Sequence, residues 1–224
     1  MAWGPYIEFF RRIQAPGQTL DVGRVIDVNH PVVTFLNVLY LLAEPGSDFG
    51  SHWRLLYRGP DGDLYRHEQP LSRFFAPQTL VGSAPPGTVD EFAKTIVVEG
   101  VPRGGTRQNG RLGGMWLREV NPQRFRMAID AIGPLLVASS EPAAPGWVVR
   151  VNHEVVPIVR VNGAFLGFWV PAGHSRVSIE YQPSSFRIGL LLALMTLATL
   201  AVIGHRSRRN RVEEWGVVGG PRSK

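Results

Sequence analysis

The chain has 224 residues, of which 44% are hydrophobic and 19% charged, so it can bury a core of its own. It contains no cysteine, which excludes disulfides, thiolate catalysis and cysteine-based metal sites. The formal net charge is +6, and the residues from His205 onward carry six basic and two acidic side chains. Because the excess charge lies mostly at one end, it is typical of a membrane-flanking segment and argues against nucleic acid as a partner.

Residues 1–45 are predicted to form an N-terminal helical or linker segment. Three large apolar residues fall on one face of a short helix over residues 3–13, before a Pro-Gly pair. Pro31 suits the first turn of a second short helix, over residues 31–37. We expect this helix to pass into a buried strand over residues 38–43.

Residues 46–183 are predicted to form a β-rich domain. Strand-like segments begin at Trp53, and Gly59-Pro60-Asp61-Gly62 makes a turn between two of them. Proline presets φ there, and glycine accepts positive φ. The Gly-rich basic stretch over residues 103–114 lacks the Gly-Lys-Ser/Thr ending of a phosphate-binding loop. It is expected to be a flexible surface loop.

The second half of this domain alternates between apolar and polar residues. The alternation is clear over residues 124–131 and 174–181, which indicates half-buried antiparallel strands. Tight turns are predicted at Asn152-His153, at Asn162-Gly163 and at Pro171-Ala172-Gly173. Five or six consecutive antiparallel strands follow from this spacing, and their most economical arrangement is an antiparallel β-sandwich.

A membrane-spanning helix is predicted over residues 186–205. Ile188 to Gly204 are seventeen residues without charge, which cover roughly 26 Å as a helix. The stem of Arg187 can extend the span at one end. Four arginines follow the apolar run within six positions: Arg206, Arg208, Arg209 and Arg211. The alternative is a buried core helix of a soluble protein, which a third function class, a soluble enzyme, would require.

The flanking charges predict the orientation of this helix. Arginines beside a span stay preferentially in the cytoplasm, so residues 206–224 are expected to form a basic cytoplasmic tail and the β-domain to lie outside. The N-terminus shows no signal-peptide pattern that would export the domain. Either the chain is tail-anchored with its domain inside, or it is the end of a longer polytopic protein.

A run of short motifs resembles the C-terminal end of the YfhO-type bacterial membrane proteins. Ser-Glu-Pro precedes Pro-Gly-Trp, and a hairpin, Asn-Gly-Ala-Phe, Val-Pro-Ala-Gly-His and Tyr-x-Pro-Ser-Ser-Phe follow in order before the span. The residues that match are Ser140, Glu141, Pro142, Pro145, Gly146, Trp147, Asn162, Gly163, Ala164, Phe165, Val170 to His174, Tyr181 and Pro183 to Phe186. Phe35 to Tyr40 is similar to the family's Leu-Asn-Val-Arg-Tyr element, with Leu39 replacing the arginine.

The resemblance implies a GT-C-like membrane protein of a bacterial cell envelope. In that family a multispan bundle, thought to move sugars from polyprenyl-phosphate carriers, bears an extracytoplasmic β-rich domain. The family's presumed catalytic residues lie in early loops of the bundle, so no catalytic residue can be assigned in this chain. The partners implied are the lipid bilayer and a multispan glycosyltransferase part.

Few residues of the chain suggest chemistry of their own. The six histidines are scattered, so no metal site and no cofactor are expected. Ser139 and Ser140 are expected to make turn hydrogen bonds, and the turn also accounts better than catalysis for Asp61 and Asp63.

Four strand aromatics are candidates for stacking on a sugar, although filling a core is their commoner role. Phe165 and Trp169 share a strand face and Phe168 lies on the other. Trp147, Phe165 and Trp169 are taken as the candidate glycan-binding residues.

Two functions remain in view. The first is a membrane-anchored β-domain that positions or gates a cell-envelope glycosylation system without catalysing. The alternative is a freestanding membrane-anchored module that binds glycan or a protein partner.

Overall fold

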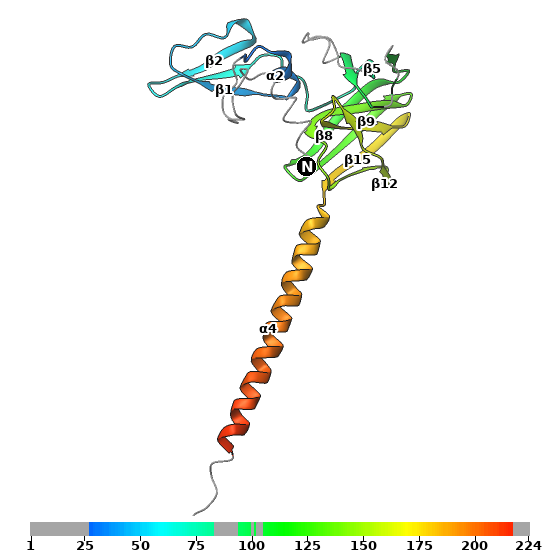
Figure 1. Ribbon diagram of the computed structural model, residues 1–224. Helices are drawn as coiled ribbons and strands as arrows, with labels where there is room; N and C mark the ends of the chain where they lie inside the picture. The colour runs from blue at the N-terminus through cyan, green and yellow to red at the C-terminus, as the bar shows by residue number, and fades with distance from the viewer. Residues whose placement is uncertain (1–26, 83–93, 100, 102–104, 217–224) are drawn as a thin grey trace, which may run out of the picture. The chain divides into compact units, whose positions relative to one another are not determined.

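The computed structural model describes residues 27–82, 94–99, 101 and 105–216 of the chain (Figure 1). It divides into two compact units, with the boundary between Tyr181 and Gln182. The described part of the first unit consists mainly of β-strands, and that of the second contains one long helix. The predicted mainly β fold with a C-terminal apolar helix is therefore confirmed. The helix predicted over residues 3–13 lies outside the described residues.

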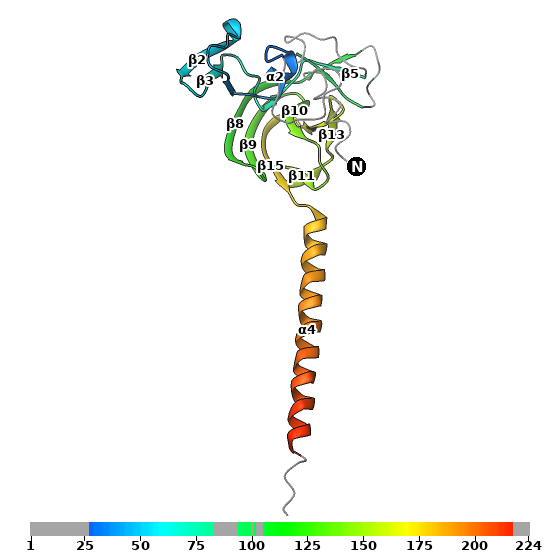
Figure 2. The ribbon, with the colours of Figure 1, turned by 60° about the vertical axis from the view of Figure 1, so that its left-hand side comes forward.

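Two antiparallel sheets of the first unit form the predicted sandwich (Figure 2). The larger sheet has the strand order β12-β11-β15-β9-β8. Its strands are β8 Arg111–Asn121, β9 Arg124–Ile132, β11 Trp147–Val151, β12 Glu154–Val156 and β15 Gly173–Tyr181. The smaller sheet has the order β13-β14-β10-β4. Its strands are β4 Phe74–Phe75, β10 Leu135–Pro142, β13 Val159–Val161 and β14 Phe165–Val170.

Apolar side chains from both sheets meet in the core of the sandwich. On β9, Phe125, Met127 and Ile129 are buried, while the residues between them are exposed or half-buried. Val177 and Ile179 of β15 join the same cluster from the neighbouring strand. The smaller sheet contributes Phe74, Leu135, Val137, Leu166, Phe168 and Val170. The alternation read from the sequence is therefore confirmed on β9 and β15.

The smaller sheet is covered on its second face too. Leu136, Ala138 and Phe165 belong to a second cluster, together with Phe35 of helix α2 (Pro31–Phe35). The rings of Phe35 and Phe165 meet edge to face, with their centroids 4.8 Å apart. Because both faces of β10 and β14 are buried there, β14 and the first four residues of β10 are apolar and do not alternate.

The described part of the first unit also contains two three-stranded sheets. One has the order β1-β3-β2, with β1 Tyr40–Ala43, β2 Trp53–Arg58 and β3 Asp63–His67. The 3-10 turn Gly50–His52 precedes β2. The other has the order β6-β5-β7, with β5 Thr79–Val81, β6 Thr95–Val97 and β7 Thr106–Arg107, and its β5–β6 pair is parallel. The prediction of a buried strand over residues 38–43 is wrong in part. The strand β1 starts only at Tyr40. Its side chains are exposed or half-buried, because one face of this sheet is open.

The predicted tight turns are confirmed where the chain reverses on itself. Asn152 and His153 have φ of 51° and 76° and join β11 to β12. Asn162 and Gly163 have φ of 49° and 74° and join β13 to β14. Positive φ at both central residues matches the twist of a two-residue hairpin. Residues 171–173 instead lead from β14 in one sheet to β15 in the other.

The prediction of a flexible loop over residues 103–114 is wrong for residues 105–114, which are the part of this stretch that the structure describes. That stretch contains β7 and the start of β8. A Cβ on Gly110 would come within 2.2 Å of the carbonyl oxygen of Pro134. Glycine is therefore needed there for the close approach of two backbone segments, not for flexibility.

Helix α4 spans Ser184–Gly216 in the second unit. Ser184–Ile203 is long and apolar enough to cross a membrane, and none of this stretch is buried. Thr196 and Thr199 donate their hydroxyl hydrogens to carbonyls four residues earlier, at 2.9 Å each. The helical backbone continues through most of the segment predicted as a tail, and residues 217–224 lie outside the described residues.

Candidate functional site

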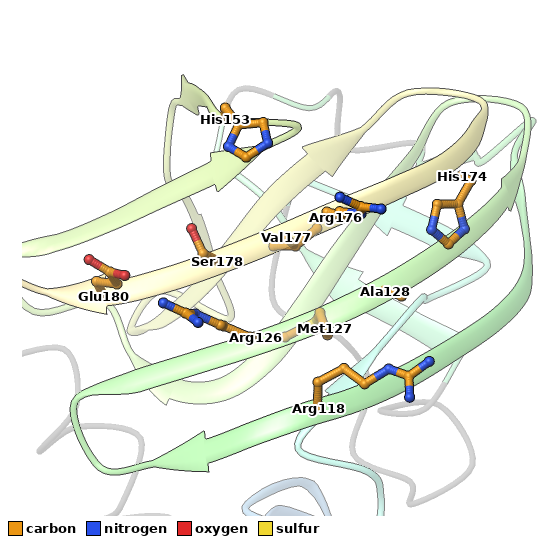
Figure 3. Close-up of a pocket in the computed structure, with 10 residues that line it drawn as sticks. All are labelled: Arg118, Arg126, Met127, Ala128, His153, His174, Arg176, Val177, Ser178 and Glu180. Atoms are coloured by element: carbon orange, nitrogen blue, oxygen red, sulfur yellow. The ribbon is translucent and has the colours of Figure 1, made fainter.

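The outer face of the five-stranded sheet forms a shallow groove lined by several charged side chains. Its volume is about 620 Å³, and β8, β9, β15 and the β11–β12 turn surround it (Figure 3). We call it the outer groove. Its polar lining residues are Arg118, Arg126, His153, His174, Arg176, Ser178 and Glu180. These side chains share one face because successive residues of a strand alternate between the core and the outside.

Several charges of this face are paired. The Nε of Arg126 lies 3.4 Å from a carboxylate oxygen of Glu119, and the Nε of Arg124 lies 3.4 Å from Glu180. The Nδ1 of His174 lies 2.6 Å from an Asp130 carboxylate oxygen on the neighbouring strand.

Two cations at the groove have no ion-pair partner in the described part of the chain. Among the residues that the structure describes, none forms an ion pair with the guanidinium of Arg118 or Arg176. Both arginines are exposed. The outer groove therefore offers two free positive charges to an anion.

An indole ring lies beside the groove. Trp116 on β8 is 48% exposed and pairs across the strands with Ala128, which in turn pairs with Arg176. A Cβ on Gly114 would come within 2.3 Å of the Trp116 ring, so the indole lies over this glycine. Trp116 was not among the predicted site residues. The tryptophan lies in a Met-Trp-Leu run that is apolar at every position, so the pattern does not say which side chain faces outward.

The three predicted glycan-binding residues do not lie together. Phe165 is fully buried in the second core, so its ring presents no surface to a ligand. Trp169 on the same strand is 46% exposed. Trp147 is half-buried on the larger sheet, between Phe125 and Tyr181, with ring centroids 5.9 Å and 5.2 Å away. Of the three, Trp169 is the ring with the most exposed face.

The predicted orientation residues lie on α4. Arg187, Arg206, Arg208, Arg209 and Arg211 all fall within its helical backbone, and their side chains are outside the described part of the structure. Their role in membrane orientation stays a prediction.

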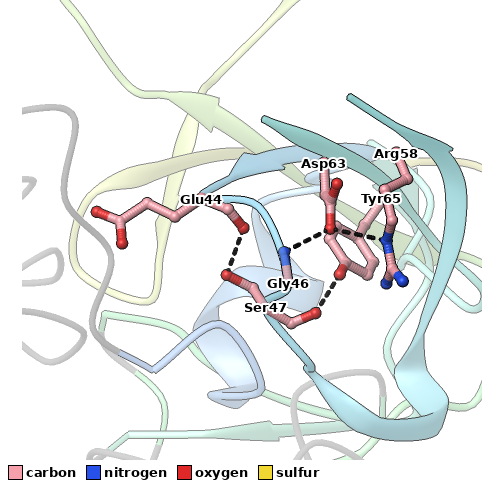
Figure 4. A network of polar contacts seen from close by, with 6 residues as sticks. All are labelled: Glu44, Gly46, Ser47, Arg58, Asp63 and Tyr65. Carbon is pink, nitrogen blue, oxygen red and sulfur yellow. Dashed lines mark hydrogen bonds and ion pairs between the residues drawn. The ribbon is translucent and has the colours of Figure 1, made fainter. Parts of the chain in front are cut away.

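Asp63 is a buried structural carboxylate. Its Oδ2 accepts a hydrogen bond from the Gly46 backbone N–H at 2.9 Å and lies 3.4 Å from the Nε of Arg58 (Figure 4). The hydroxyl of neighbouring Tyr65 donates to the Ser47 carbonyl. Asp61 is exposed in the turn before β3. These contacts tie the segment after β1 to β3, in agreement with the structural role expected for Asp63.

In the part of the chain that the structure describes, two titratable groups have shifted pKa values, and neither lines the outer groove. Burial lowers the pKa of His67, assisted by His52 and opposed by Glu68. Burial raises the pKa of Glu141, and Arg73 at 3.4 Å opposes this rise.

Within the described residues, no cluster of three or more His, Asp or Glu side chains could hold a metal ion. Ser139 donates its hydroxyl hydrogen to the Leu166 carbonyl at 2.7 Å and accepts from the Glu141 N–H, which is a structural arrangement.

A second hollow, of about 730 Å³, is mainly apolar. Leu112, Met115, Leu117 and Val120 of β8 line one side of it, and Phe74 and Phe75 of β4 lie on the other. The two-residue strand β4 is too short to cover the inner face of β8, so this face is partly open. Most residues that line this second hollow are apolar and offer no group for catalysis.

Comparison with known proteins shows a similarity for part of the chain. The family model described as "Bacterial membrane protein YfhO" matches residues 117–193, which run from β8 through β15 into the beginning of α4. The chain is also 29% identical over 68 residues to the YfhO protein of Bacillus subtilis (strain 168). That alignment covers 30% of this chain and 8% of the Bacillus protein. No solved structure matches the chain.

Proposed function

Residues 117–193 relate this chain to the YfhO family of bacterial membrane proteins, and on that basis we propose that it is a membrane-anchored, extracytoplasmic β-domain that serves cell-envelope glycosylation. One observation carries the proposal: the family match continues from the sandwich strands into the apolar helix. The matched part therefore contains strands of the β-domain and the start of the helix that would anchor it. A β-domain joined to such a helix can be held at the membrane surface.

The anchor supports the membrane part of this proposal. Ser184–Ile203 is apolar on all sides, and its large side chains are exposed, for example 66% for Leu197 and 61% for Leu200. Such a surface is stable in lipid, where every backbone group of a helix finds its own partner. With the arginines after the span in the cytoplasm, the β-domain lies on the extracytoplasmic side.

The domain positions or gates a multispan glycosyltransferase part and does not itself transfer sugar. The carboxylate Asp63, once a candidate for acid–base work, is committed to backbone and arginine contacts, and Ser139 to backbone contacts. The polar residues of the outer groove offer binding charges, and no nucleophile with an adjacent base is found among them.

Sugar analysis of the envelope tests this role. Deleting the gene should lower the sugar content of an envelope polymer, and the full-length chain should restore it. Purified in detergent, the full chain alone should transfer no sugar from a polyprenyl-phosphate donor. Unchanged envelope sugar in the deletion strain would contradict the proposal, and unaided transfer by the purified chain would contradict the accessory role.

A second candidate function is favoured by one exposed aromatic side chain. Trp169 presents almost half of its surface, although the other large residues of β14 are buried. This is the arrangement expected of a module that recognises a glycan or a protein partner. If that is its function, Trp169→Ala should weaken binding of envelope glycan without lowering the thermal stability of the domain.

A further inference from the structure

We propose that the outer groove binds a sugar ring that carries a carboxylate or a phosphate group. Trp116 is the surface on which the ring stacks, and Arg118 and Arg176 bind its negative charge. The inference goes beyond the anchoring role, and it uses a different sheet from Trp169.

The Trp116 ring lies beside the outer groove and is partly supported by its own strand. It lies over Gly114, where any larger residue would collide with it. Its neighbour across the strands is Ala128, a residue too small to fill the space beside the indole. A half-exposed aromatic ring on a strand is suited to the apolar C–H face of a sugar, because it loses little conformational entropy on binding.

Strand pairing places Arg176 in the same row of the sheet as Trp116, at a backbone separation that leaves room for one sugar ring. Trp116, Ala128 and Arg176 occupy the same register on the successive strands β8, β9 and β15. Two strand spacings separate Trp116 from Arg176 at the backbone, about 10 Å. The side chain between them is a single methyl group, so the middle of this row is a notch in the sheet surface.

Arg118 reaches the same groove because the pairing of β8 with β9 shifts there. The register changes between Leu117 and Glu119, and Arg118 lies in this irregularity. Bulges of this kind re-aim a side chain next to functional sites. Since neither Arg118 nor Arg176 is neutralised by a described carboxylate, an anionic ligand gains charge-assisted hydrogen bonds without displacing an existing ion pair.

Further polar groups that can bind sugar hydroxyls lie on the same face. Ser178 lines the groove next to Arg126, and the His174–Asp130 pair occupies the row beside Ala128. Hydroxyl, imidazole and carboxylate groups can donate to or accept from sugar hydroxyls. A bare phosphate would use the arginines alone and leave the indole without a partner. The indole and the two arginines together therefore favour a ligand that has both a sugar ring and a negative charge.

A purely structural role for Trp116 is the competing explanation. An aromatic ring over a strand glycine shields the backbone that the glycine leaves bare. That role predicts a loss of stability on removal of the indole but no change in ligand affinity. Binding measurements on folded variants separate the two.

The test is titration calorimetry on the full chain in detergent micelles. Glucuronate and glucose 6-phosphate are the probes, and glucose and inorganic phosphate are the matched compounds that lack either the anion or the ring. Both probes should bind more tightly than glucose or phosphate. Trp116→Ala, Arg118→Ala and Arg176→Ala should each weaken probe binding by about tenfold. Tyr40→Ala and Arg160→Ala, which remove an exposed aromatic and an exposed arginine from other sheets, should leave it within about twofold.

Gly114→Ala gives a second, independent variant. Its added methyl group displaces the indole from its support without removing it, because the clash is with the end of a side chain that can move. Weakened probe binding with an unchanged melting temperature supports the platform. The proposal is overturned if neither probe binds, if the Trp116→Ala protein binds like the original, or if inorganic phosphate binds equally well. Micelles doped with phosphatidylglycerol are the last arm, and competition by this sugar-free lipid as strong as that of the probes would assign the groove to a membrane surface instead.

Discussion

At the scale of single residues, Asp63 is the clearest case of a side chain that holds the fold. The residue is fully buried, and its Oδ2 accepts the Gly46 N–H hydrogen bond and pairs with Arg58. Asp63→Ala leaves these donors without their acceptor, so we expect the free energy of unfolding to fall by about 1–3 kcal/mol. Asp61→Ala is the matched control: this carboxylate is exposed two positions away, and its loss should change stability by less than about 0.5 kcal/mol. Urea denaturation of the two variants measures the difference, and equal losses would show that the Asp63 contacts contribute nothing.

His67 makes stability depend on pH. Its Nδ1 accepts the Gln69 N–H at 3.1 Å, so the proton of the neutral ring is on Nε2, which faces the Thr34 hydroxyl at 3.3 Å. Burial lowers its pKa, so the unfolded chain binds this proton more tightly than the folded one. The contribution of His67 is therefore fully present above the unfolded value of about 6.5 and is lost as the pH falls below it toward the lowered folded pKa.

Denaturation curves between pH 5 and 8 for the original chain and for His67→Asn check this prediction. The stability difference between the two proteins should shrink as the pH falls through this window. A difference that stays constant across it would mean that His67 does not titrate with folding.

At the scale of elements, the Asn162-Gly163 turn fixes the β13–β14 hairpin and joins it to β6. Asn162 donates its N–H to the Val97 carbonyl at 2.8 Å, and its side-chain oxygen accepts the Val97 N–H at 3.1 Å. Gly163 has φ of 74° with open space around its missing Cβ, so a substitution there is opposed by the backbone conformation alone. We expect Gly163→Val to cost about 1–2 kcal/mol of unfolding free energy, and Gly163→Asn clearly less, because asparagine tolerates this region. Equal destabilisation by valine and asparagine, measured by urea denaturation, would contradict this account.

The same elements show what local patterns can and cannot predict. Turns such as Asn162-Gly163 depend on a few neighbouring residues, and alternation on β9 depends on one buried face, so both could be predicted. The burial of β14 on both faces depends on α2, which lies more than a hundred residues earlier, and no local signal reports that contact. Phe165 was consequently assigned a surface role that its complete burial does not permit. Trp116 was missed because it lies between Met115 and Leu117, in an apolar run that does not show which side chain faces outward.

At the scale of the whole molecule, composition and sequence order predicted the class of architecture well. To predict a mainly β unit followed by an apolar helix, only the alternation of the strands and one uncharged run have to be recognised, and both are local patterns in the sequence. Predicting the outer groove would require knowledge of how β8, β9 and β15 pair, because this pairing brings residues 118, 126 and 176 together. Such a site can be found only after the strand order and register are known.

The central claim is that α4 crosses a membrane with the β-sandwich outside the cytoplasm and the arginine-rich end inside it. Reporter fusions test this most directly: alkaline phosphatase, which is active only outside, and a fluorescent protein that matures only in the cytoplasm, each fused after residue 182 and after residue 216. We predict phosphatase activity without fluorescence for the fusion after residue 182, and fluorescence without phosphatase activity after residue 216. The reverse pattern, or fluorescence at both positions, would contradict the account.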